Sequence, residues 1–171
     1  MTTARQQRKQ YRAFLATPAT IALLTLVPLS EAPAAPTADA VTDRVVVNWH
    51  TGLAIDGYDP VAYFTDGRPL PGSAEFELSY GGVVWRFRNI GNRAAFAERP
   101  DVYMPQFGGY DPLGIAHGVA VAGNPMLWRI SGERLFLFYD RARLKTFTAD
   151  PQRAIAAAER KWPDVLRTLN P

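Results

Sequence analysis

The sequence repeats a pattern of turn residues and aromatics at a nearly fixed spacing. Gly57-Tyr58-Asp59-Pro60 returns 52 positions later as Gly109-Tyr110-Asp111-Pro112. After a one-residue deletion, further positions recur at a spacing of 51: Gly67, Gly72, Gly81, Phe87, Phe96 and Pro100 return as Gly118, Gly123, Gly132, Phe138, Phe147 and Pro151. A repeat of this kind predicts one supersecondary unit used twice. Because the repeated residues are mainly glycine, proline and aromatics, the repeat says more about the fold than about a chemical function.

The first 40 residues have the order of composition that is typical of an export signal. Four basic residues and no acidic one lie within residues 1–12, an uncharged and largely apolar stretch covers residues 13–29, and small residues and prolines continue to Ala40. This order predicts a signal peptide cleaved after Ala40. The alternative is an uncleaved membrane anchor, although the apolar stretch is short for a bilayer span and contains two prolines. We expect a periplasmic or otherwise exported protein, or one anchored to the inner membrane by residues 13–29.

The positive charge of the chain belongs largely to this leader. Four of the 19 basic residues and two of the 16 acidic residues precede residue 41, so the remainder carries 15 basic against 14 acidic side chains. A segment so close to neutrality has no cationic field to recruit nucleic acid or an anionic membrane. The chain also has no cysteine. This excludes disulfides, thiolate catalysis, iron–sulfur ligation and cysteine-based zinc sites.

Residues 41–171 predict one small α+β domain in which two related turn–β-hairpin–helix units pack together. Unit one covers about 57–103, unit two about 109–151, and a C-terminal helix follows over 151–169. Polar and apolar residues alternate before Gly81-Gly82, which predicts a hairpin through that turn. We expect strands over 44–49, 75–80, 83–87, 127–130 and 135–139, and helices over 59–64, 89–99, 140–149 and 151–161, the last resuming after Pro163.

The spacing of Phe87, Phe96 and Pro100, followed by Asp101-Val102-Tyr103, resembles the YHS domain family. The segment Gly57-Tyr58-Asp59-Pro60-Val61-Ala62-Tyr63-Phe64 and the run Gln106-Phe107-Gly108-Gly109-Tyr110 resemble it too, so the likeness covers roughly residues 50 to 170. The resemblance implies a small α+β module of a kind that is often attached to metal transporters.

The positions that the resemblance assigns to metal ligands hold other residues here. In metal-handling members, cysteines lie one and five positions beyond the first phenylalanine, where this chain has Arg88 and Asn92, and in the second unit Tyr139 and Arg143. Many exported relatives have a further cysteine at the position of Asp111. Arginine stays protonated and cannot ligate a metal. We therefore expect no bound metal and no cofactor.

Equivalent carboxylates at Asp59 and Asp111 are the strongest candidates for a shared chemical role. The structural alternative is that each caps the helix that the following proline opens. His50 and His117 are the only histidines. A copper site could use His117 with Asp111, Met104 or Met126, but no cluster of imidazole or thioether ligands at close spacing occurs.

The aromatic residues divide into an expected core and a group for which two roles remain open. The repeated Phe87, Phe96, Phe138 and Phe147 are expected to pack the interior. Tyr58, Tyr110, Trp85 and Trp128 belong to the core or line a ligand cleft. Trp49 is expected to cover an edge of the domain, and Trp162 to dock the C-terminal helix.

These features favour a non-catalytic binding or accessory module of YHS type, which binds an unidentified small molecule or protein partner. The candidate ligand-binding residues are Tyr58, Asp59, Tyr110, Asp111 and His117. One alternative is a periplasmic copper-handling protein that uses histidine, aspartate and methionine. The other is an enzyme, which requires Asp59, Asp111 and His117 to converge in one cleft. No nucleophile elbow, phosphate-binding glycine loop or zinc-protease motif occurs in the sequence.

Overall fold

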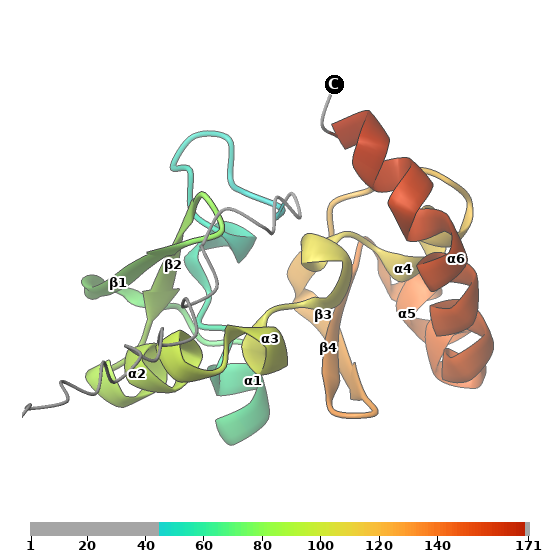
Figure 1. Cartoon of the computed structure of the whole chain (residues 1–171). Coiled ribbons are helices and arrows are strands. Elements are labelled where there is room, and N and C mark those ends of the chain that lie inside the picture. The colour runs from blue at the N-terminus through green and yellow to red at the C-terminus, as the bar shows by residue number, and fades with distance from the viewer. Residues whose placement is uncertain (1–44, 170–171) are drawn as a thin grey trace, which may run out of the picture. The chain divides into compact units, whose positions relative to one another are not determined.

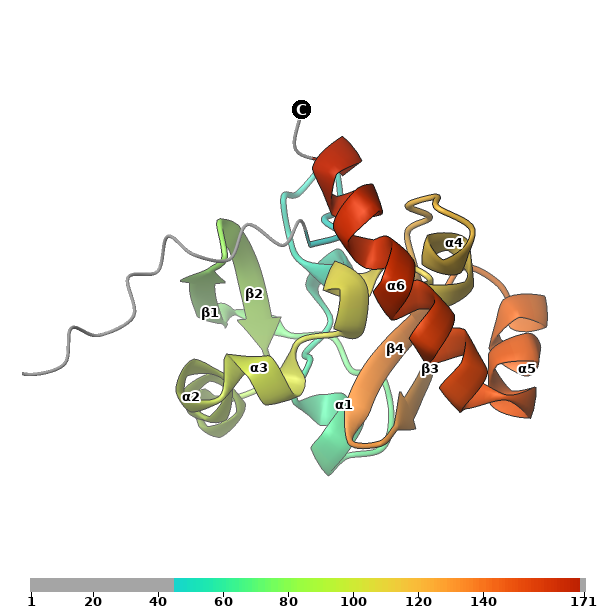
Figure 2. The same cartoon turned by 45° about the vertical axis from the view of Figure 1, so that its right-hand side comes forward.

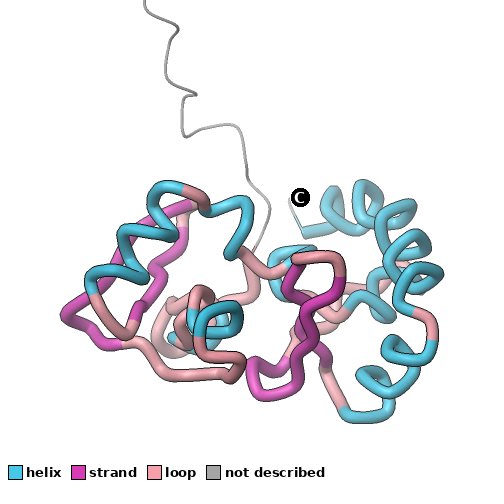
Figure 3. Tube along the Cα trace, turned by 90° about the horizontal axis from the view of Figure 1, so that it is seen from below, coloured by secondary structure: helices cyan, strands magenta, loops and turns pink. Residues whose placement is uncertain are grey.

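The computed structural model describes residues 45–169 and combines helices with small antiparallel sheets, which confirms the α+β class (Figures 1 and 3). The predicted leader, residues 1–40, lies outside this range, as does Arg44. Within the range, no helix is both long enough and apolar enough to cross a membrane.

Two segments of similar order follow one another along the chain. The first contains η1 (Ile55–Gly57), α1 (Ala62–Thr65), β1 (Ser73–Tyr80), β2 (Val83–Phe87), α2 (Ile90–Glu98) and α3 (Pro100–Tyr103). The second contains η2 (Gln106–Gly109), α4 (Pro112–Ala116), β3 (Asn124–Ser131), β4 (Arg134–Phe138), α5 (Arg141–Ala149) and the long C-terminal α6 (Pro151–Leu169).

Both predicted hairpins are present. Strands β1 and β2 pair antiparallel across Gly81-Gly82, whose φ angles of +61° and +75° suit the tight turn of a two-residue hairpin. Strands β3 and β4 pair antiparallel in the same way across Gly132 and Glu133. Each hairpin has one register irregularity, and it falls at matching places, after Ser73 and after Asn124.

The helices that follow the hairpins also begin where the sequence predicts. The side chain of Asn89 accepts a hydrogen bond from the Asn92 amide at the start of α2, and Asp140 accepts one from the Arg143 amide at the start of α5. These are N-cap bonds, in which a side-chain oxygen satisfies an N–H that the first turn of a helix leaves free.

Two expectations about secondary structure were wrong. The segment 44–49 is no strand within the described residues: Val47 alone forms an isolated bridge, because the Asn48 side chain accepts hydrogen bonds from the His50 and Thr51 amides and turns the chain back. Helix α1 begins at Ala62, after a turn, instead of at residue 59.

Helix α6 confirms the predicted C-terminal helix over 151–169, and it runs through Pro163 without a break.

The packing differs from the expected single shared core. Phe87, Phe96, Phe138 and Phe147 are fully buried, as predicted, but they belong to two clusters. Strand β4 contributes to both clusters, because alternate side chains of a strand point to opposite faces. Its leucines, Leu135 and Leu137, join the cluster of the first segment, whereas Phe136 and Phe138 join the second cluster. Helix α6 packs in that second cluster and lies alongside α4 (Figures 1 and 2).

Matched glycines fix the start of each hairpin. The Gly72 amide donates to the Gly57 carbonyl, and the Gly123 amide donates to the Gly109 carbonyl. A Cβ at Gly72 would lie 2.5 Å from the backbone of Arg86, so no side chain fits there; Gly123 is equally crowded. These matched contacts are what a tandem unit would produce, and the duplication itself stays a prediction.

Candidate functional site

Asp59 is fully buried, and both of its carboxylate oxygens are occupied by hydrogen bonds. Oδ1 accepts from the amides of Val61 and Ala62 at 2.8 and 3.3 Å. Oδ2 accepts from the amide of Arg88 at 2.8 Å and from Nδ2 of Asn92 at 2.6 Å. The carboxylate therefore joins the turn before α1 to the end of β2 and the start of α2.

Asp111 is fully buried in the same way. Its Oδ1 accepts from the amides of Leu113 and Gly114 at 2.8 and 3.0 Å and lies 3.4 Å from Nη1 of Arg143. Its Oδ2 accepts from the amide of Tyr139 at 2.8 Å. Asp111 is the N-cap of α4, which confirms the capping interpretation for this residue.

The capping interpretation needs one correction at Asp59. Its bonds to Val61 and Ala62 are of the capping kind, but α1 starts only at Ala62 and has Val61 as its N-cap residue. Both aspartates do more than cap, because each also binds the end of a hairpin. The side chains of Asn92 and Arg143 contribute to these contacts, Asn92 at Asp59 and Arg143 at Asp111.

The predicted candidates do not meet in one cleft. His117 is exposed at the end of α4, with Nδ1 2.6 Å from the Leu113 carbonyl oxygen. None of the hydrogen bonds of Asp59, Asp111 and His117 joins two of these side chains. Over residues 45–169, no group of three or more histidine, aspartate or glutamate side chains could hold a metal ion. Met126 is 56% exposed.

The two candidate tyrosines are half-buried and pack on the interior. Tyr58 lies against the cluster of the first segment and Tyr110 against that of the second. Tyr58 forms an isolated backbone bridge with Pro71, and Tyr110 forms one with Ala122. These contacts assign both tyrosines a place in the fold.

The tryptophans lie in four different settings. Trp85 is fully buried, and Trp128 is half-buried with its ring edge-on to Tyr63. Trp49, expected to cover an edge, is 84% exposed, and its ring lies beside that of His50. Trp162 docks α6 as predicted, packing on the second cluster beside Tyr110.

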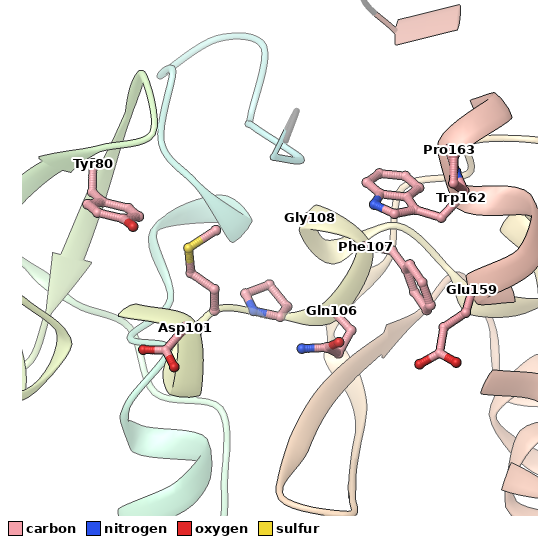
Figure 4. A pocket seen from close by; sticks show the side chains of 10 residues that line it. Tyr80, Asp101, Gln106, Phe107, Gly108, Glu159, Trp162 and Pro163 are labelled. Atoms are coloured by element: carbon pink, nitrogen blue, oxygen red, sulfur yellow. The ribbon is translucent and has the colours of Figure 1, made fainter. Parts of the chain in front are cut away.

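A cavity of about 380 Å³ opens beside Trp162. Figure 4 shows Tyr80 and Asp101 on one side of it, and Phe107, Trp162 and Glu159 on the other. These residues come from the end of β1, from α3, from η2 and from α6.

The aromatic wall of the cavity includes a backbone outlier. Phe107 has φ +54° and ψ +32°, a left-handed conformation that a bulky residue adopts at a cost of about 1–3 kcal/mol. Its ring stands edge-on to Trp162, with the ring centres 5.6 Å apart. Pro163 in the facing helix has no N–H for the Glu159 carbonyl, so α6 lacks one helical hydrogen bond at this point.

Two carboxylates border the cavity, and their surroundings differ. Glu159 forms an ion pair with Arg134, Nη1 to Oε1, at 2.8 Å. Asp101 is exposed in the first turn of α3, and no hydrogen bond or ion pair joins its side chain to another residue of the range 45–169.

Sequence reasoning missed this cavity. Its walls come from residues far apart in the chain, and none of the five predicted ligand-binding residues lines it. The one signal in the sequence that points to this region is the bulky Phe107 directly before Gly108-Gly109. In the structure all three residues have positive φ and form a sharp turn.

No protein-family model, no curated protein and no solved structure matches this chain.

Proposed function

We propose that the protein is an exported, non-catalytic binding or accessory module of YHS type, and that its ligand is a small molecule held in the cavity beside Trp162. The composition of the leader supports export. The spacing of aromatics, glycines and prolines supports the YHS resemblance.

The observation that carries the proposal is the contrast between the two aspartates and the cavity. A general acid or base must come within hydrogen-bond reach of the atom it protonates or deprotonates. Asp59 and Asp111 have no exposed surface, and their oxygens already accept bonds from the backbone. Both side chains therefore hold the fold together and do not present a reactive group.

The cavity has the character of a small-molecule site. Such sites have volumes of roughly 300–1,000 Å³ and combine apolar walls with a few polar groups that orient the ligand. Here Tyr80, Phe107 and Trp162 supply apolar surface, and Gln106 and the two carboxylates supply polar groups (Figure 4).

The test is native mass spectrometry with elemental analysis of the mature protein purified from the periplasm, followed by a thermal-shift screen of small molecules. The proposal expects a co-purified organic molecule or a saturable stabilisation. A Trp162→Leu variant that remains folded should lose this effect, whereas the exposed-residue control Trp49→Leu should keep it.

Stoichiometric copper or zinc would contradict the proposal. So would ligand binding that survives Trp162→Leu but is lost in a folded His117→Ala variant.

A further inference from the structure

Resting on the proposed function, we infer that the cavity beside Trp162 selects a small organic cation, with a positively charged nitrogen between its aromatic walls and a carboxylate. The ionisable side chains in the lining are acidic. The described residues that line the cavity include Asp101 and Glu159, and none of them is a lysine, an arginine or a histidine. An anionic ligand would meet the like charge of Asp101, and a cation would meet an opposite one.

Aromatic side chains line the cavity on two sides. Tyr80 lies on one side, and Phe107 and Trp162 lie on the other (Figure 4). The faces of aromatic rings attract cations, tryptophan most strongly. Met104 adds a polarisable thioether to the lining.

One of the two carboxylates is available to a ligand. Glu159 shares its charge with Arg134, whereas the Asp101 side chain has no partner within the described part of the chain. Asp101 also lines a second hollow together with Arg99 and Arg134, but neither arginine forms an ion pair with it. Asp101 is therefore the group that would bond to or neutralise the ligand's positive charge.

The test compares choline with its neutral carbon isostere, in which a tert-butyl group replaces the trimethylammonium group. The two probes have the same shape, so a difference between them reports the charge. Titration calorimetry of the mature chain at low salt should show choline binding at least about five-fold more tightly than the isostere.

Two variants and two matched controls locate the effect. Asp101→Asn should weaken choline binding roughly two- to five-fold and leave the isostere unchanged, as expected for one exposed charge. Trp162→Leu should weaken choline binding roughly ten-fold. Asp164→Asn removes a charge from α6 outside the cavity, and Trp49→Leu removes an exposed indole; both should bind choline like the unaltered protein.

The outcomes separate this inference from the proposed function. Equal affinity for choline and the isostere, with both lost in Trp162→Leu, would overturn the cation and leave the binding module standing. Failure of choline to bind would also overturn the cation, and a co-purified neutral or anionic ligand whose binding needs Trp162 would then still support the module. Failure of choline together with the absence of any co-purified or screened ligand would overturn both.

Discussion

Replacing either buried aspartate with alanine should destabilise the protein far more than the loss of an ordinary helix cap. A cap is worth about 1 kcal/mol. Asp59 accepts four hydrogen bonds in a fully buried position, two from the following turn and two from the hairpin end. Hydrogen bonds to a charged group contribute about 1.5–3 kcal/mol each, but their energies are not additive, and water can reach some of the freed donors.

We therefore expect Asp59→Ala and Asp111→Ala each to lower the free energy of unfolding by about 3–5 kcal/mol, because each substitution leaves three backbone N–H groups without their acceptor. The assay is urea denaturation monitored by circular dichroism. The midpoint urea concentrations are converted to free energies of unfolding with the same m-value for every variant. The control is Asp66→Ala, which removes a surface carboxylate from an ion pair with Arg88 and should cost less than about 1 kcal/mol. A loss of 1 kcal/mol or less at Asp59 and Asp111 would refute the structural role of both carboxylates.

Three further predictions concern the core and the turns. Phe87→Ala should cost about 3–5 kcal/mol in urea denaturation, because the ring is fully buried, and an unchanged midpoint would disprove its place in the core. Burial raises the pKa of the Tyr63 hydroxyl, and the nearby Tyr58 and Asp59 raise it further. The free energy of unfolding should therefore fall as the pH rises above about 10, because there only the unfolded chain ionises this residue. Tyr63→Phe loses the bond to the Pro125 carbonyl, so it should cost about 1 kcal/mol at neutral pH and flatten that alkaline decline; an unchanged slope would argue against the assignment. Gly72→Ala should lower the melting temperature, because the added Cβ would clash with the Arg86 backbone. An unchanged melting temperature would show that the start of β1 can move away from the end of β2 without loss of stability.

Local signals in the sequence predicted most of the secondary structure. The Gly81-Gly82 turn and the polar–apolar alternation before it located the first hairpin, and Asn89 and Asp140 are short polar residues that start helices at the expected places. Proline has no N–H, so the helix was expected to break at Pro163, yet α6 continues through it. Packing of Ile155, Ala158 and Val165 on the second cluster holds both sides of the proline in one helix.

The candidate site was harder to predict, because spacing along the chain does not show what surrounds a side chain. The Gly-Tyr-Asp-Pro repeat singled out Asp59 and Asp111 as a candidate pair, but it did not show that both are buried and bonded to hairpin ends. The cavity escaped prediction since Tyr80, Phe107 and Trp162 come together only through the tertiary fold.

The most direct test is a backbone and side-chain NMR titration of residues 41–171 with choline. The indole N–H of Trp162 and the amides around Phe107 should shift in a saturable manner, whereas the resonances of Asp59, Asp111 and His117 should stay in place. Shifts centred on His117 and the two Gly-Tyr-Asp-Pro turns, with Trp162 unaffected, would contradict this prediction.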